Sequence, residues 1–131
     1  NNKETNRKNS DSRLSQRALR EIYLRPFEIV IREAGPWAVM SSYNIINGRR
    51  ASESRELLTD ILREDWGYTG MVMTDWWTKG EHYKEILAGN DLKMANGYPE
   101  RVRQALDLGL VSREDLETCA RRVLELILKI D

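Results

Sequence analysis

The sequence predicts an α/β fold in which parallel strands alternate with helices, as they do in a segment of a (β/α)8 TIM barrel. Short apolar runs typical of strands covered on both faces lie between longer segments with apolar residues at helical spacing. The length fits about half a barrel, since a complete one takes about 250 residues and this chain has 131. A small doubly wound sheet is the alternative, but the few strands predicted here make a poor one.

The first helix is predicted to begin at Ser15, a residue type that caps helices well, and to continue through Ile31. Pro26 is expected to kink or divide this helix, because proline lacks a backbone donor and clashes with the preceding turn. Gly35 and Pro36 are expected to end it.

The predicted strands are the short apolar runs at residues 37–43, 71–75 and 92–95. Residues 44–50 are expected to form a loop, with Asn47 and Gly48 as its turn. Further helices follow from apolar spacing and from capping residues at their ends. They are expected to begin at Ser52, near Tyr83, at Pro99 and at Ser112, the first three ending at Gly67, Gly89 and near Gly109.

Composition and charge narrow the classes of partner. The chain has 21 basic and 21 acidic residues, so no overall charge favours nucleic acid. No apolar run reaches the ~18 residues that a membrane span requires, and the polar amino end indicates no signal peptide. Cys119 is the single cysteine, which excludes an internal disulfide and slightly favours the cytoplasm over secretion, while the compartment stays open.

Asp75 ends the second predicted strand and is followed by two tryptophans, Trp76 and Trp77. Ligands of parallel α/β folds bind at the carboxyl ends of the strands, where such aromatics form a platform for a sugar or a base. The alternative is an aspartate that only bonds the amides of the next turn. Tyr43 closes the first strand in the same way, so its phenol is expected to reach the same rim.

The remaining reactive residue types indicate no site. His82 is the only histidine, so neither a metal-ligand set nor a nucleophile–histidine pair is predicted, and we expect His82 to be solvated. Cys119 lies on the apolar stripe of the last helix and is expected to be a small buried side chain. Because no glycine-rich phosphate loop is present either, the sequence predicts no metal and no cofactor.

Four stretches together resemble glycoside hydrolase family 3, namely "NNKETNR", "WAVMSSYNIING", "LLTDILREDWGYTGMVMTDWW" and "AGNDLKM". They occur in the order and approximate spacing of that family's (β/α)8 domain. The resemblance implies that residues 1–131 are one partial domain, the carboxyl-terminal half of the barrel. It also implies a retaining β-glycoside hydrolase of the β-glucosidase or β-xylosidase type, which acts through a covalent glycosyl-enzyme.

The resemblance implies a role for each matching residue. Asp75, in the "TDW" motif, is expected to be the nucleophile, and Tyr43 to donate a hydrogen bond that orients it. Arg7 by itself would be read as a surface arginine, but the resemblance makes it a ligand of the sugar hydroxyls. Met40 is expected to line the sugar pocket, and Trp76 to border the sugar or its leaving group.

The resemblance also indicates parts that residues 1–131 lack. The family commonly has Gln where this chain has Lys3, and a Lys-His pair that grips the sugar precedes that stretch. The first barrel half and the α/β sandwich domain that usually brings the acid/base are missing too, and Glu53 and Glu81 match no family acid. The expected partners are therefore a small β-glycoside and these missing parts, without which the segment should be nearly inactive.

Two other interpretations stay open. A half-barrel remnant would bind sugar or a partner chain without turnover, and a self-contained doubly wound domain would use Asp75 only to cap a turn. Half a barrel also exposes sheet edges, so copies of the chain are expected to associate through them.

Overall fold

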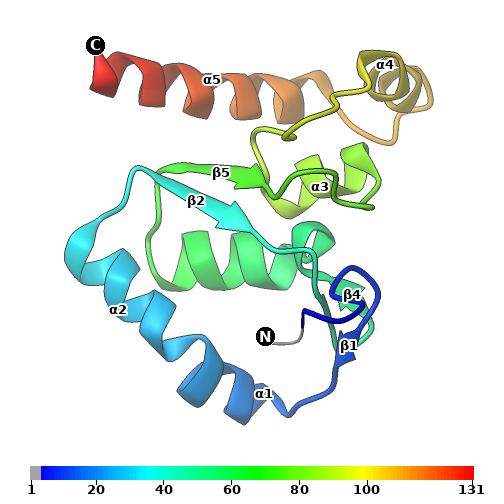
Figure 1. Cartoon of the computed structure of the whole chain (residues 1–131). Helices are drawn as coiled ribbons and strands as arrows, with labels where there is room; N and C mark the ends of the chain where they lie inside the picture. The colour runs from blue at the N-terminus through cyan, green and yellow to red at the C-terminus, as the bar shows by residue number, and fades with distance from the viewer. Residues whose placement is uncertain (1–3) are drawn as a thin grey trace.

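Two parallel strands form the centre of the structure, a computed structural model that describes residues 4–131 (Figure 1). β2 (Ala38–Ser41) pairs with β5 (Met71–Thr74), with Ala38 opposite Met71 and Ser41 opposite Thr74. Both strands lie inside their predicted ranges, and their parallel pairing is the one that alternating strands and helices imply. The chain is thus an α/β unit, as predicted.

The predicted third strand is reduced to one parallel bridge between Met73 and Leu92. Side chains replace part of the main-chain ladder here, since Asp91 accepts from the Val72 amide at 2.8 Å and Thr74 accepts from the Met94 amide at 3.0 Å. Ala95, with φ of 71°, then turns the chain away. The described sheet is therefore narrower than the sequence indicated.

The predicted loop at residues 44–50 is wrong, because these residues form a β-hairpin. β3 (Ile45–Ile46) pairs antiparallel with β4 (Arg49–Arg50) across a two-residue turn in which Asn47 and Gly48 both have positive φ, 50° and 84°. Asn-Gly is the favoured sequence for this turn. β1 (Asp11–Ser12) pairs parallel with β3, which gives a second, mixed sheet that was not predicted.

The first helical segment is divided as predicted. Ser15 accepts from the Ala18 amide at 3.1 Å and so caps α1 (Gln16–Ala18), which continues as the π-helix η1 (Leu19–Tyr23). α2 (Arg25–Ala34) then begins with Pro26 in its first turn, where a missing N–H costs nothing, and ends at Gly35 with φ of 54°.

The second helix begins later than predicted. Ser52 lies in the short 3-10 helix η2 (Ala51–Glu53), where it is buried and its hydroxyl lies 3.2 Å from that of Thr78. Ser54 instead accepts from the Leu57 amide at the start of η3 (Glu56–Asp65). Ser52 therefore contacts a residue distant in sequence, Thr78, and signals for helix starts, which are local, do not reveal such a contact.

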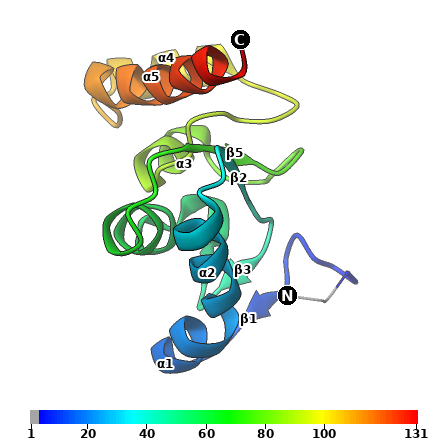
Figure 2. The same cartoon turned by 90° about the vertical axis from the view of Figure 1, so that its left-hand side faces the viewer.

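The last three helices match their predicted positions. They are α3 (His82–Ala88), α4 (Pro99–Asp107) and α5 (Arg113–Ile130). Gly89 ends α3 in the left-handed conformation, and Ser112 and Asp115 form the predicted reciprocal cap of α5. Figures 1 and 2 both place α5 and α1 at opposite ends of the molecule, with the β2–β5 pair between them.

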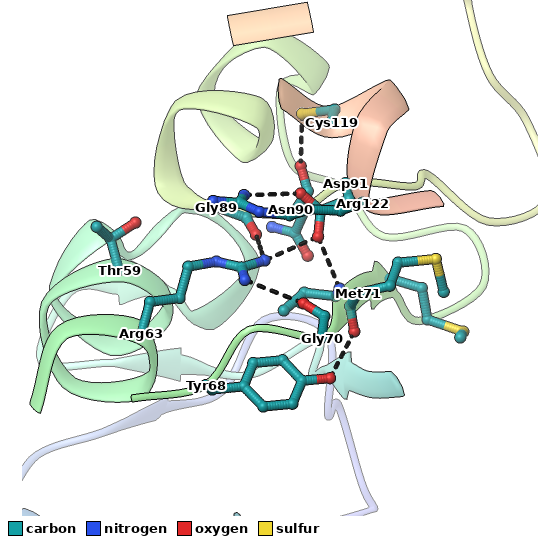
Figure 3. Close-up of polar contacts among 12 residues, drawn as sticks. Thr59, Arg63, Tyr68, Gly70, Met71, Gly89, Asn90, Asp91, Cys119 and Arg122 are labelled. Carbon is teal, nitrogen blue, oxygen red and sulfur yellow. Dashed lines mark hydrogen bonds and ion pairs between the residues drawn. The ribbon is translucent and has the colours of Figure 1, made fainter. Parts of the chain in front are cut away.

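The apolar core lies between η3 and the β2–β5 pair. Its buried members are Ile31, Leu58, Leu62, Tyr68, Val72 and Ala88. A polar network continues from the core to α5, and Figure 3 shows its centre, Asp91, which is fully buried. One Asp91 oxygen lies 2.8 Å from Arg63 of η3 and the other 2.9 Å from Arg122 of α5, so this carboxylate joins three elements with β5 included.

Several helices leave large apolar side chains uncovered. Phe27 of α2 is 62% exposed and Leu128 of α5 is 77% exposed. Exposed apolar area of this extent is typical of a surface that another part of a protein covers. Within the described residues, no helix combines the length and the apolar character needed to cross a bilayer.

Candidate active site

Asp75 stands at the carboxyl end of β5, where the parallel pair opens. Its amide donates to the Ser41 carbonyl at 3.1 Å, which extends the β2–β5 ladder by one bond and fixes the start of the following loop. Its Oδ1 accepts from the Trp76 amide at 2.6 Å, and the residue is half-buried. The carboxylate thus lies at the strand end that suits a ligand, while one oxygen also serves the next turn.

Tyr43 lies at the same end of the pair and is 93% buried, being only 7% exposed. Its hydroxyl donates to the main-chain carbonyl of Trp76, the residue next to Asp75. Burial raises the pKa of the phenol, and the Asp75 carboxylate raises it further by hydrogen bonding and by charge. The phenol therefore stays protonated, and its one hydrogen is donated to the Trp76 carbonyl, one residue from the Asp75 carboxylate that it was expected to bond.

Arg7 is the third member of this group. Its guanidinium carbon lies 5.0 Å from the centroid of the Tyr43 ring, and Nη1 pairs with Glu4 at 2.9 Å on the surface. Lys8 lies over the same ring, with Nζ 4.8 Å from the centroid. The sequence interpretation did not include Lys8, although its place beside Arg7 in a basic stretch was a usable signal.

Met40 and Trp76 are both exposed apolar side chains. Met40 is 53% exposed on β2, opposite Met73, while the neighbouring Ser41 is buried and bonds the Asn90 side chain at 2.7 Å. Trp76 is 41% exposed, and Trp77 adopts a positive φ of 53°, which is uncommon for a bulky residue. Two hollows on the described part of the chain, one beside Trp66 and one beside Leu87, are lined by residues other than those of this group.

His82 is partly buried, not fully solvated as the sequence led us to expect. Its Nδ1 is buried and has no hydrogen-bond partner within residues 4–131. Burial, and to a smaller extent the positive charge of Lys93, lowers the pKa of the imidazole to about 4. The ring is therefore neutral near pH 7, and the burial that causes this depends on the fold and is not visible in the sequence.

Of the two unassigned glutamates, Glu53 bonds the main chain of the other. Glu53 Oε1 accepts from the amide of Glu81 at 2.7 Å, next to the start of α3.

Cys119 is partly buried, its thiol donates to the Asn90 carbonyl at 3.4 Å, and burial raises its pKa to about 11. In the described part of the chain, no group of three or more His, Cys, Asp or Glu side chains is placed to hold a metal ion.

Comparison of the whole sequence with known protein families identifies the family of this chain. Residues 3–126 match the profile described as "Glycosyl hydrolase family 3 N terminal domain". The chain belongs to glycoside hydrolase family 3. The matched domain is the N-terminal domain of family 3 proteins. The expectation of a carboxyl-terminal half therefore refers to a position within this one domain, not within the whole protein.

Proteins similar to this family 3 chain include a β-glucosidase and an exo-α-(1→6)-L-arabinopyranosidase. It is 59% identical over 117 residues to β-glucosidase A of Butyrivibrio fibrisolvens, covering 89% of this chain and 14% of the relative. It is 40% identical over 130 residues to an exo-α-(1→6)-L-arabinopyranosidase of Bifidobacterium longum, covering 98% of this chain and 17% of the relative. The chain therefore spans about a sixth of the length of these relatives.

Solved structures agree with the family assignment. The fold superposes on a family 3 β-glucosidase of Bifidobacterium adolescentis with a TM-score of 0.93 and 41% identity, covering 98% of this chain and 19% of that one. β-Glucosidase 3B of Thermotoga neapolitana, solved with α-D-glucose, gives a TM-score of 0.89 at 40% identity over 94% of this chain and 19% of that one. The small sheets described above are thus part of a family 3 N-terminal domain.

Proposed function

We propose that this chain is the carboxyl-terminal half of a family 3 barrel and carries the nucleophile of a retaining β-glycoside hydrolase. In such an enzyme an ionised carboxylate attacks the anomeric carbon to form a covalent glycosyl-enzyme, which water then hydrolyses. Asp75 is the nucleophile in this proposal. The substrate is a β-glucoside or β-xyloside, in keeping with the β-glucosidase relatives.

The observation that carries the proposal is the pairing of Asp75 with Tyr43 at the carboxyl ends of β5 and β2. The buried phenol donates its one hydrogen to the Trp76 carbonyl, and burial and the Asp75 carboxylate both raise its pKa, so it stays neutral. It thereby fixes the main chain of Trp76, whose amide donates to Asp75 Oδ1 at 2.6 Å, and so limits the orientations of this carboxylate. A retaining nucleophile requires a fixed orientation toward the anomeric carbon.

Three residues around this pair form the proposed sugar site. Arg7 lies over the Tyr43 ring, so its guanidinium is within reach of hydroxyls on a sugar held above Asp75. Trp76 is exposed and follows the carboxylate directly, which suits contact with the apolar face of a sugar. Met40 supplies an exposed apolar side chain on the neighbouring strand.

The reaction needs a second carboxyl group, about 5–5.5 Å from the first, to protonate the leaving group. Glu53 and Glu81, the nearest candidates in sequence, are joined by a main-chain contact at the start of α3 and are not assigned this role. We infer that the acid/base comes from parts of the complete enzyme that residues 1–131 do not include. Activity is therefore expected only when the chain is completed by the rest of the barrel and the acid/base domain.

Labelling with a 2-fluoro β-glucoside tests the nucleophile. The chain, completed with the remaining family 3 parts, is incubated with the reagent and its intact mass is measured. We expect one added fluoroglucosyl group, located by peptide mapping on Asp75, and no addition to Asp75→Ala. Equal labelling of the Asp75→Ala variant would contradict the assignment.

A second candidate is a half-barrel remnant that binds sugar or a partner chain without turnover. The uncovered apolar side chains of α2 and α5 favour a bound partner. The same labelling experiment separates the two functions. A complete form that binds glucose in calorimetry but gains no fluoroglucosyl mass would support the remnant.

A further inference from the structure

A buried ion pair lies beside the loop that follows Asp75. Lys93 Nζ is 2.5 Å from Glu85 Oε2, and the two side chains are 6% and 0% exposed. Removing two charges from water is costly, and an apolar pair of similar volume often gives equal or greater stability. The presence of this pair therefore points to a role besides stability.

The ammonium group of Lys93 also contacts the main chain of the loop. It donates to the Gly80 carbonyl at 3.1 Å, near the end of residues 75–81, which contain no helix or strand. The Lys93 backbone is fixed at the other end of the loop, since its neighbours Leu92 and Met94 both bond to Thr74, the last residue of β5. Lys93 therefore connects the end of the strand to the end of the loop.

The loop packs against the Glu85 side chain at Gly80. A Cβ added to Gly80 would lie 2.2 Å from Glu85 Oε1, so the glycine backbone packs directly against the carboxylate. This same Oε1 is buried and accepts no hydrogen bond from the described residues. Lys93 is thus the cation that compensates Glu85, and losing it would leave a buried negative charge under the loop.

We propose that Lys93, held by Glu85, is a positioning residue that fixes the loop carrying Asp75. β5 holds the amino end of this loop and Lys93 holds the other end through Gly80. The loop also contains Trp77 in its uncommon left-handed conformation, which persists only when the surroundings hold it. The effect of Lys93 on catalysis rests on the proposed function of Asp75. The claim that Lys93 fixes the loop, called the mechanical claim below, rests on the contacts alone.

Hydrogen exchange of the chain tests the mechanical claim. In Lys93→Met we expect the amides of residues 76–81 to exchange at least about tenfold faster, because the loop loses a charge-assisted bond, while α5 amides keep their rates. Lys84→Met is the matched control, since Lys84 is exposed on α3 and has no ion pair among the described residues. It should leave both regions unchanged.

The double variant Glu85→Gln/Lys93→Met covers the case in which Lys93→Met unfolds. It removes the contact to Gly80 without leaving a buried charge, so the fold should persist and residues 76–81 should still exchange faster. Unchanged exchange in residues 76–81, or an equal rise in residues 76–81 and in α5, would overturn the proposal in favour of a purely structural pair.

Labelling of the completed enzyme adds the catalytic readout. We expect the double variant to react with a 2-fluoro glycoside about 10–100 times more slowly at an unchanged melting temperature, since small displacements of reacting groups have effects of this size. A rate equal to that of the parent would contradict the positioning role. Failure of the parent to react would instead contradict the proposed function, and the exchange result would still decide the role of Lys93 in the loop.

Discussion

Arg7 lies over the ring of Tyr43, with its guanidinium carbon 5.0 Å from the ring centroid, although one residue comes from the polar amino-terminal stretch and the other follows β2. The contact brings a cation, a buried phenol and, through Tyr43, the Asp75 carboxylate to one rim.

Replacing Arg7 should weaken substrate binding. In the completed enzyme, Arg7→Met is expected to raise KM for an aryl β-glucoside about 10–100-fold, since a hydrogen bond from a charged group is worth roughly 1.5–3 kcal/mol. Arg13→Met is the control, because Arg13 pairs with Asp11 on the surface and its side chain is 76% exposed. Steady-state kinetics checks both variants. If Arg7→Met and Arg13→Met had equal KM values, Arg7 would not be a ligand of the substrate.

Removing the Tyr43 hydroxyl should affect catalysis more than folding. Tyr43→Phe loses the bond to the Trp76 carbonyl, which we expect to cost about 0.5–1.5 kcal/mol of stability in urea unfolding. The rate of glycosyl-enzyme formation should fall by about tenfold or more, because the Trp76 main chain that holds Asp75 is no longer fixed by the phenol. A variant with the parent's labelling rate would show that the phenol does not position Asp75.

Replacing the buried Asp91 carboxylate should lower the free energy of unfolding strongly. Asp91→Asn leaves Arg63 and Arg122 without their counter-charge, and breaking a buried pair costs about 3–5 kcal/mol. Glu117→Gln is the matched control, because it removes an acid from the exposed pair with Arg113, worth at most ~0.5 kcal/mol. Urea unfolding of the chain measures both changes, and similar values would mean that the Asp91 network contributes little.

Gly80 should tolerate no side chain. Gly80→Ala places a methyl group against the buried Glu85 carboxylate, and we expect a loss of about 1–3 kcal/mol. Gly97→Ala is the control, because a Cβ there meets nothing within 4 Å. Thermal unfolding compares them, and a Gly80→Ala protein as stable as the control would contradict the packing of the loop on Glu85.

His82 should make the chain less stable in mild acid. Its pKa is about 4 in the folded chain, below the ordinary 6.5, because burial and Lys93 disfavour the charged ring. The unfolded state then takes up the proton first, so stability falls as the pH drops from about 6.5 to about 4. The full loss is at most roughly 3 kcal/mol.

A His82→Asn variant isolates this contribution from the carboxylates that titrate in the same range. The difference in unfolding free energy between parent and variant should change between pH 7 and pH 4 and then level off. A difference that is independent of pH would show that the ring is not held neutral.

Local signals made much of the fold predictable from the sequence. The Ser112–Asp115 cap, the division at Pro26 and the end of α3 at Gly89 each depend on neighbouring residues, and all three are present. Asp75 and Tyr43 were placed together because strand ends share an edge in parallel folds. These features required no knowledge of distant contacts.

Features that depend on distant partners were missed. Ser52 bonds Thr78 instead of capping a helix, and Asp91 and Thr74 replace part of a third strand. His82 is neutral because the fold buries it and brings Lys93 near it. The Asn47–Gly48 hairpin is the exception, because its turn sequence was recognised but the strands beside it were too short to register as apolar runs.

The pairing of β1 with β3 has a consequence for the order of folding. α5 is a local, well-capped helix that forms without closing a long loop, whereas Arg7 reaches Tyr43 only after β1 has joined the hairpin, where Asn47 bonds both the amide and the carbonyl of Leu14 at 2.9 Å. Contacts between distant segments form late. We therefore expect the rim around Asp75 to be assembled after α5 during refolding.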